Sequence, residues 1–280
     1  MDTTVITGSS GKAGRSVVRH FIDHGYKVLG VDRVRPERSD APTLLADLTN
    51  PHEAWEAIKG ARYVVHLANI PAPGIYAESR TLLENLSMNA AVFRAAADAG
   101  VERVSWASSE TTLGLPFDTP PRFAPIDETH YPYPESSYAL SKVLTETMAE
   151  QYARTTGIPF MAFRLSNVME PHDYAAFPSY WDNASLRRWN LWGYIDARDA
   201  AQAFRLGLET QVGGAEAFII AAEDTVMNRP SAELLAEVFP KVPLARPVDG
   251  FETLLLIDKA RRMLGYRPEH TWRSELGQSI

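Results

Sequence analysis

The sequence predicts an α/β fold built on a doubly wound parallel sheet, with a small lobe at its C-terminal end. Short runs of β-branched residues alternate with amphipathic helices through the first two thirds of the chain, a pattern typical of parallel sheets covered on both faces. A glycine-rich turn follows the first of these runs at residues 8–14. The 280 residues are 45% hydrophobic and 22% charged, which is ordinary for a globular protein.

The first part of the chain supplies most of the expected sheet. Its β-branched runs predict strands, and the apolar residues between them fall on helical stripes. Pro51 suits the first turn of a helix, and Gly100 ends a long alanine-rich one. The expected elements are strands at 3–7, 27–31, 43–46, 62–67 and 101–107, and helices at 13–24, 51–59 and 77–99.

The regular alternation continues to Asn167 and then stops. A proline-rich stretch at 116–134 predicts a loop, and residues 171–192 are rich in aromatic residues, proline and arginine, as expected of a separate lobe. The remaining elements are strands at 159–165, 194–195 and 217–221, and helices at 136–156, 198–208, 231–238 and 258–264. We therefore expect two units, residues 1–166 and residues 167–280, with elements of the second returning to the first.

Composition narrows the possible functions. Lys and Arg number 28 against 35 Asp and Glu, and the formal charge of −7 argues against a nucleic-acid binder. The chain has no cysteine, which excludes thiol nucleophiles and Cys-ligated metals, and we expect no metal site. No stretch approaches the ~18 apolar residues of a membrane span, and no signal-peptide pattern opens the chain. We expect a cytoplasmic protein with no membrane partner.

The turn at residues 8–14 predicts a ligand. Gly8, Gly11 and Gly14 have G-x-x-G-x-x-G spacing between an expected strand and an expected helix. Such glycines permit a tight turn, a close backbone approach to a pyrophosphate, and close packing of the helix on the sheet. The N–H groups at the helix start then face the phosphates. The pattern predicts a Rossmann-type dinucleotide site, with an ordinary glycine-rich connection as the alternative.

Asp32 ends the second expected strand. A carboxylate at this position accepts hydrogen bonds from the adenosine ribose hydroxyls and repels a 2′-phosphate, which favours NAD over NADP. Three basic neighbours, Lys12, Arg33 and Arg35, could each reach a 2′-phosphate, so NADP stays an alternative.

A tyrosine, a lysine and a serine complete the expected chemistry. Tyr138 and Lys142 stand four residues apart, on one face of a helix. An ammonium near the phenol favours the phenolate and lowers the tyrosine pKa, which makes Tyr138 a better base near neutral pH. Ser109, at the end of a strand, offers a hydroxyl that can hold the reacting oxygen. Each feature alone is common in protein cores, but together they predict a nicotinamide-dependent oxidoreductase.

These motifs resemble the extended short-chain dehydrogenase/reductase superfamily, in its NAD-dependent epimerase/dehydratase group, over nearly the whole chain. The shared patterns are T-G-x-x-G-x-x-G at 7–14, D-L at 47–48, H-L-A at 66–68, Y-x-x-x-K at 138–142, R-x-x-N at 164–167 and L-G-Y-x-P at 264–268. By this resemblance Ser109 is the catalytic hydroxyl, Tyr138 the acid or base, and Lys142 the ribose anchor that also modifies the tyrosine pKa.

The resemblance also implies the binding residues and the assembly. The expected cofactor contacts are Gly8, Gly11, Lys12, Ala13, Gly14, Asp32, Arg33, Asp47, Leu48, Leu67, Ala68, Asn69, Asn85, Tyr138, Lys142 and Val168. The expected substrate contacts are Ser109, Glu110, Thr111 and Asn167. The helices at 77–99 and 136–156 resemble the dimer interface of the family, which implies a homodimer.

Within the group, the pattern after Ser109 and around Tyr174 is nearest to the uronate dehydrogenases, which oxidise a free sugar acid. Ala175 stands where that family places an arginine for the substrate carboxylate, and Arg187 and Arg188 are the candidates to replace it. Glu110 is expected either to accept a bond from a substrate hydroxyl or to lie in a surface loop. Because Thr111 follows it instead of the second acid that dehydratases use, dehydration is not expected.

We therefore expect an NAD-dependent enzyme that oxidises a hydroxyl of a sugar or sugar-acid-like substrate, with Tyr138 taking the hydroxyl proton and NAD the hydride. The alternatives are an epimerase of sugars or nucleotide sugars that retains its NAD, and an NAD-sensing regulator without turnover. A set of aromatic residues is expected either to stack on the sugar or to form the core of the lobe: Phe177, Tyr180, Trp181, Trp189 and Trp192.

Overall fold

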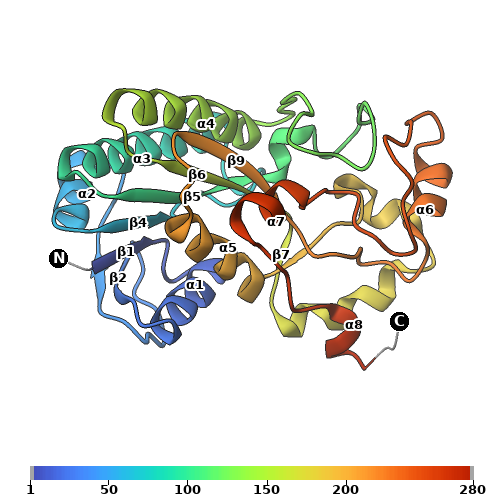
Figure 1. Ribbon diagram of the computed structural model, residues 1–280, viewed down its shortest axis with the longest axis horizontal. Helices are drawn as coiled ribbons and strands as arrows, with labels where there is room; N and C mark the ends of the chain where they lie inside the picture. Colours follow the sequence, from blue (N-terminus) through green and yellow to red (C-terminus); the bar gives the residue numbers. More distant parts are fainter. Residues whose placement is uncertain (1–2, 278–280) are drawn as a thin grey trace.

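The main body of the protein is a seven-stranded parallel sheet with helices on both faces (Figure 1). The computed structural model describes residues 3–277. The strand order is β3-β2-β1-β4-β5-β6-β9, and every pairing in the sheet is parallel. The strands are β1 (Thr3–Thr7), β2 (Lys27–Asp32), β3 (Thr43–Leu45), β4 (Tyr63–His66), β5 (Arg103–Ser109), β6 (Phe160–Leu165) and β9 (Ala215–Ile220). The α/β class and the doubly wound sheet predicted from the alternation are confirmed.

Eight α-helices lie within the described residues: α1 (Lys12–Asp23), α2 (Pro51–Ile58), α3 (Glu78–Ala99), α4 (Ser137–Thr156), α5 (Ala197–Glu209), α6 (Ser231–Val238), α7 (Asp258–Leu264) and α8 (Trp272–Glu275). The expected helices and strands agree with these bounds to within two residues at either end. The sequence patterns missed short elements: the two-residue strand β7 (Val168–Met169) and the 3-10 helix η1 (Glu110–Leu113), together with α8.

Two apolar layers hold the helices to the sheet. Neighbouring residues of a strand point to opposite faces, so Val5 of β1 packs in the layer under α2 and α3, while Ile6 packs in the layer under α1 and α5. Both side chains are buried, as expected for a parallel strand covered on both sides. In Figure 1, α3 and α4 lie along one face of the sheet and α1 and α5 along the other.

The strand order reverses at β1, which lies between β2 and β4. The connection after β1 goes to one side of the sheet and the connection after β4 goes to the other, so a crevice opens at their C-terminal ends. The fold therefore places the residues that follow β1, β2, β4, β5 and β6 around one space.

The chain beyond residue 167 divides between the sheet and a lobe. It returns β9 to the sheet edge and α5 to the face that carries α1. The lobe contains two 3-10 helices, η2 (Pro171–Tyr180) and η3 (Ala184–Asn190), and a two-stranded parallel sheet of β7 with β8 (Ile195–Asp196). The division of the chain into units at residues 166 and 167 stays a prediction.

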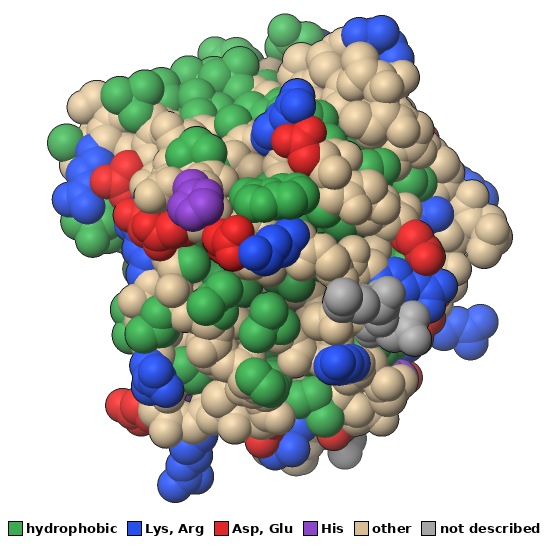
Figure 2. All heavy atoms as spheres, turned by 90° about the vertical axis from the view of Figure 1, so that its left-hand side faces the viewer, with side chains coloured by type: hydrophobic (Ala, Val, Ile, Leu, Met, Phe, Trp, Pro, Cys, Tyr) green, Lys and Arg blue, Asp and Glu red, His purple; other side chains and the backbone are tan. Residues whose placement is uncertain are grey.

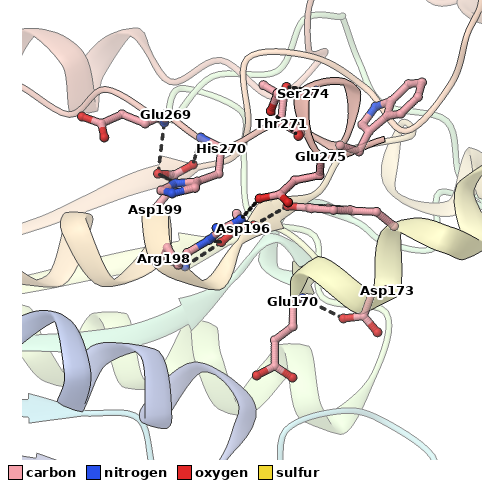
Figure 3. A network of polar contacts seen from close by, with 12 residues as sticks. Glu170, Asp173, Asp196, Arg198, Asp199, Glu269, His270, Thr271, Ser274 and Glu275 are labelled. Carbon is pink, nitrogen blue, oxygen red and sulfur yellow. Dashed lines mark hydrogen bonds and ion pairs between the residues drawn. The ribbon is translucent and has the colours of Figure 1, made fainter. Parts of the chain in front are cut away.

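Polar contacts fasten the C-terminal segment to this lobe (Figure 3). Arg198 donates to Asp196 at 2.8 Å and to Glu275 of α8 at 2.6 Å. Asp199 accepts the backbone N–H groups of residues 269 and 270 at 3.0 and 2.9 Å and pairs with the His270 ring at 2.8 Å, which raises the pKa of that histidine. These bonds fix the C-terminal segment to the end of β8 and the start of α5.

The face at the amino-terminal end of β1 carries both signs of charge. Figure 2 shows acidic and basic side chains lying next to one another there. Pairs of this kind include Lys59 with Glu56 at the end of α2, and Arg94 with Asp98 in α3 at 2.8 Å. None of the helices within residues 3–277 is both long and apolar enough to cross a lipid bilayer.

Candidate active site

The glycine turn closes tightly against the sheet. Gly8 has a positive φ of 68°, and a Cβ on it would lie 2.7 Å from the Ala68 nitrogen. A Cβ on Gly14 would lie 2.0 Å from the Gly8 oxygen, so only glycine permits this approach of α1 to the turn. The N–H of Gly11 donates to the Gly8 oxygen at 3.1 Å. The turn therefore has the shape that the sequence pattern predicts.

The amino terminus of α1 faces the crevice without a side-chain cap. Gly11 is the N-cap residue, and no side chain accepts a hydrogen bond from the first turn, which contains no acidic residue. The N–H groups at a helix start carry a partial positive charge and require an acceptor. An anion such as a pyrophosphate supplies one, and the absence of a Cβ at the turn leaves space for it.

Asp32 is held in place at the end of β2. One carboxylate oxygen accepts the N–H of Ser10 at 2.9 Å and the other accepts the N–H of Val34 at 3.1 Å. Arg33 forms ion pairs with Asp47 at 2.7 Å and Glu84 at 3.4 Å. The position that faces the crevice is thus acidic, and its basic neighbour is neutralised by two carboxylates.

A single cavity of about 1150 Å³ joins these parts to the serine, tyrosine and lysine. Its wall includes all the expected cofactor and substrate residues except Asp47 and Asn85. The sequence missed other lining residues, because they lie in loops or carry no motif: Ser10, Val34, Ala46, Ile70, Pro71, Ala72, Pro73, Ile75, Tyr76, Glu84, Met88, Ala107, Ser108, Leu115, Pro116, Ser136, Leu165 and Ser166.

Two expected cofactor residues face elsewhere. The carboxylate of Asp47 accepts bonds from Arg33 and from Thr49, while the neighbouring Leu48 lines the cavity. Asn85 is fully buried behind the wall, where its amide accepts the N–H of Ile70 at 2.8 Å and donates to the Ile70 oxygen at 3.2 Å. Asn85 therefore positions the loop after β4, and the structure gives it no place on the cavity wall.

Tyr138 and Lys142 come from the first two turns of α4 and are both buried. Lys142 Nζ lies 5.5 Å from the centre of the Tyr138 ring and donates to the Ala107 oxygen at 2.8 Å and to Asn69 at 3.2 Å. Burial lowers the pKa of Lys142 to about 7 and raises the pKa of Tyr138 to about 12. The expected lowering of the tyrosine pKa by the ammonium is therefore wrong for the chain alone, because burial raises the pKa of Tyr138 and Lys142 is not among the groups that shift it.

Ser109 has its proton available for the cavity. Its oxygen accepts the N–H of Thr111 at 3.2 Å and the Thr111 hydroxyl at 3.0 Å, so both lone pairs are engaged by Thr111. The remaining O–H can donate, and its hydrogen bond with Tyr138 partly offsets the rise in the pKa of the phenol. Thr111 therefore acts through Ser109, which it orients.

A buried polar chain that the sequence did not reveal supports the lysine. Asn69 accepts from Lys142 and donates to Asn89 at 2.8 Å, and Asn89 in turn accepts from His66 at 2.8 Å. His66 also pairs with the Thr7 hydroxyl at 2.7 Å, and burial lowers its pKa to about 4. Neutral His66 thus connects the end of β1 to the lysine through two asparagines.

Glu110 is buried, so its expected alternative place in a surface loop is wrong. Only 4% of the residue is exposed. Ser166 Oγ donates to one carboxylate oxygen at 2.6 Å, and Asn190 donates to the other at 3.2 Å. Burial raises the pKa of Glu110 to about 7, against the effect of these bonds.

The aromatic set divides between the two expected roles. Trp189 lines the cavity, whereas Phe177 and Trp192 are completely buried in the core of the lobe.

The two arginines that were candidates to bind a substrate carboxylate, Arg187 and Arg188, do not line the cavity. Arg187 lies under the Trp189 ring, 4.8 Å from its centre, and Arg188 lies 3.7 Å from the exposed Asp118.

These features define a dinucleotide-binding site that continues into a Ser–Tyr–Lys group at the reversal point of a Rossmann-type sheet. Residues 4–221 match the model of the NAD dependent epimerase/dehydratase family, and the chain belongs to that family. The resemblance inferred from the motifs is thereby confirmed, and NAD is the cofactor of this family. The uncapped α1 terminus, the glycine cradle and Asp32 fit such a group.

The chain is similar to proteins with different named activities. It is 28% identical over 187 residues to an NAD-dependent glucose-6-phosphate dehydrogenase of Haloferax volcanii, covering 61% of this chain and 71% of the relative. A UDP-glucose 4-epimerase of Thermotoga maritima shares the fold at 21% identity, with a TM-score of 0.75 over 98% of this chain and 96% of the other. A mutated uronate dehydrogenase shares it at 20% identity, with a TM-score of 0.71 over 100% and 86%.

Within residues 3–277, no three or more His, Cys, Asp or Glu side chains gather in a way that could hold a metal ion.

Proposed function

We propose that the protein is an NAD-dependent dehydrogenase that oxidises a hydroxyl group of a sugar or sugar-acid-like substrate. The observation that carries this proposal is a shared cavity: Ser109, Tyr138 and Lys142 line one part of the same space whose other part is lined by the glycine turn and Asp32. A redox sensor without turnover requires only the dinucleotide part. The buried tyrosine and its lysine supply a base that binding alone does not need.

The cofactor would be held by the wall nearest β1 and β2. The N–H groups at the start of α1 would donate hydrogen bonds to the pyrophosphate, and Asp32 would accept hydrogen bonds from the hydroxyls of the adenosine ribose. Lys142 would hold the second ribose, since its Nζ lies on the wall between Asn69 and the Ala107 oxygen. When bound, NAD supplies the hydride acceptor of the reaction.

The protein's own groups would manage the proton. Ser109 would donate its O–H, which bonds to Tyr138 in the chain alone, to the reacting oxygen and so orient it. Tyr138 accepts the hydroxyl proton of the substrate at its phenolate oxygen. Lys142 stabilises that phenolate only if its amine is charged, and a pKa of about 7 leaves it poised between its two forms near neutral pH.

The test is a screen of sugars, sugar acids and nucleotide sugars with NAD, followed by the absorbance of NADH at about 340 nm. The proposal predicts NADH formation with at least one sugar. It also predicts that Tyr138→Phe binds NAD as the wild type does but produces no NADH above background.

An epimerase is the second candidate, favoured by the family and by the fold shared with a UDP-glucose 4-epimerase. The same three side chains would serve it. Such an enzyme returns the hydride to the substrate and releases no NADH, so product analysis without bulk NADH would favour it over the dehydrogenase.

We also propose that two copies of the chain associate through α3 and α4. The two helices pack side by side at the outer face of the sheet (Figure 1). Leu83 of α3 is 63% exposed, and Leu140 and Leu144 of α4 are 37% and 42% exposed. Light scattering coupled to size-exclusion chromatography should give a dimer for the wild type and a monomer for Leu144→Glu.

A further inference from the structure

The part of the cavity beyond Ser109 has a wall of mixed character. It contains the apolar Leu115 and Pro116, the aromatic Trp189, the polar Ser166 and Asn167, and the acidic Glu110. The charge of Glu110 raises the pKa of Tyr138, which places this carboxyl group in electrostatic range of the phenol. An acidic group thus lies close to the catalytic tyrosine at this end of the cavity.

The basic side chains that line the cavity all lie on the cofactor side, and each is bonded to other groups of the protein. Among the residues that line the cavity, the basic ones are Lys12, Arg33 and Lys142. Lys12 pairs with Asp173 at 2.5 Å and donates to the Val168 oxygen at 3.2 Å, and Arg33 pairs with two carboxylates. Lys142 donates to Asn69 and to a backbone oxygen. Among residues 3–277, the wall beyond Ser109 therefore offers no free cation for a carboxylate or a phosphate.

Arg187 lies behind this wall. It is 6% exposed, donates to the Gly193 oxygen at 3.2 Å, and both of its terminal nitrogens lie 3.2 Å from the amide oxygen of Asn167 when that amide is oriented to accept them. Burial lowers the pKa of Arg187, and Glu110 is the acidic group that opposes this most. Asn167 stands between the guanidinium and the cavity, so Arg187 compensates the charge of Glu110 from behind and is not presented to a ligand.

From this arrangement we infer that the substrate is an uncharged sugar, which donates a hydroxyl to Glu110 and lays a face of its ring on Trp189. The inference rests on the proposed function and narrows its substrate class. A carboxylate accepts hydrogen bonds and donates none, so it selects hydroxyl groups. The same carboxylate disfavours uronates, sugar phosphates and nucleotide diphosphates. Their negative charge would repel that of Glu110, and no free cation lies beside it to offset the repulsion in a cavity of low dielectric constant.

The test compares kcat/KM for sugars of the same configuration that differ in charge. The pairs are glucose with glucuronate, galactose with galacturonate, and mannose with mannuronate, and glucose 6-phosphate and UDP-glucose extend the glucose set. Because burial raises the pKa of Glu110 to about 7, the assay is run at pH 8.5, where the carboxyl group is ionised. We expect the neutral member of the preferred pair to be used at least about tenfold better than its anionic counterparts.

Two variants assign the preference to the carboxylate. Glu110→Gln keeps the size and removes the charge, and it should reduce the ratio of neutral to anionic kcat/KM by about tenfold or more. Glu150→Gln removes a charge from the exposed side of α4 and should leave the ratio unchanged. A ratio that does not change in Glu110→Gln, or a wild-type enzyme that prefers the anionic sugars, overturns this inference and leaves the proposed function standing. Failure to oxidise any sugar overturns the proposed function itself.

Discussion

Replacing Lys142 should make the protein more stable at neutral pH while abolishing catalysis. Lys142 is 2% exposed, and burial lowers its pKa from 10.5 to about 7. Between these two pH values, the lysine binds fewer protons in the folded protein than in the unfolded chain. The resulting penalty is complete below the folded pKa and disappears as the pH rises toward the unfolded pKa, so this group makes the wild type more stable at higher pH.

The size of the effect follows from the two pKa values. The penalty is about 4 kcal/mol at pH 7 and about 1.4 kcal/mol at pH 9.5. Methionine has a similar length and no charge, so Lys142→Met removes this penalty. It also removes the hydrogen bonds to Ala107 and Asn69, which costs about 2 kcal/mol in total. The variant should therefore be about 2 kcal/mol more stable than the wild type at pH 7, and slightly less stable at pH 9.5.

The assay is urea unfolding of both proteins at pH 7 and pH 9.5, followed by far-UV circular dichroism. The informative quantity is the change in the stability difference between the two pH values, about 3 kcal/mol, because packing losses affect both measurements equally. Lys27→Met, at an exposed position on β2, is the control and should show no such change. A stability difference for Lys142→Met that is the same at both pH values would show that burial does not lower the pKa of Lys142.

Three further predictions concern the site. Tyr138→Phe should lower kcat by at least about 10²–10⁴ with an unchanged dissociation constant for NAD, and a kcat within tenfold of the wild type would argue against the base. In Glu110→Gln the rise of kcat/KM with pH should occur at lower pH than in the wild type, because the charge of Glu110 raises the pKa of Tyr138. A rise at higher pH, or at the same pH, contradicts this. Gly14→Ala should weaken NAD binding by about tenfold or more in isothermal calorimetry, since the added Cβ would lie 2.0 Å from the Gly8 oxygen. Gly213→Ala is the control: its added Cβ meets no atom within 4 Å, and this variant should bind NAD as the wild type does.

Much of the fold could be predicted because its signals are local. The alternation of strands and helices, the stop at Gly100 and the glycine turn each depend on a few neighbouring residues, and they located the strands of the sheet and the dinucleotide turn. β7 and α8 were missed because elements of two and four residues have no periodicity to detect. Their positions depend on contacts such as that of Arg198 with Glu275, which are distant in sequence.

Site residues that belong to a sequence motif could be predicted. The pKa values of these residues could not, because they depend on burial. The glycines, Asp32, Ser109, Tyr138 and Lys142 were found by spacing, and they do meet at one cavity. The direction of the Tyr138 pKa was wrong, because a sequence does not reveal that the phenol and its amine are both desolvated. Asn89, which joins His66 to the lysine support, has no pattern of its own and is evident only from the packing of α3 against α4.

In the proposed reaction, a hydride leaves the sugar and remains on NAD. The most direct measurement uses the preferred sugar carrying deuterium at the oxidised carbon, with NAD in excess and the nucleotide analysed by mass spectrometry. The account predicts NADH that carries the deuterium, formed in proportion to the oxidised sugar and absent in Tyr138→Phe. A labelled epimer of the sugar with no NADH in solution, or no reaction with any sugar, would contradict it.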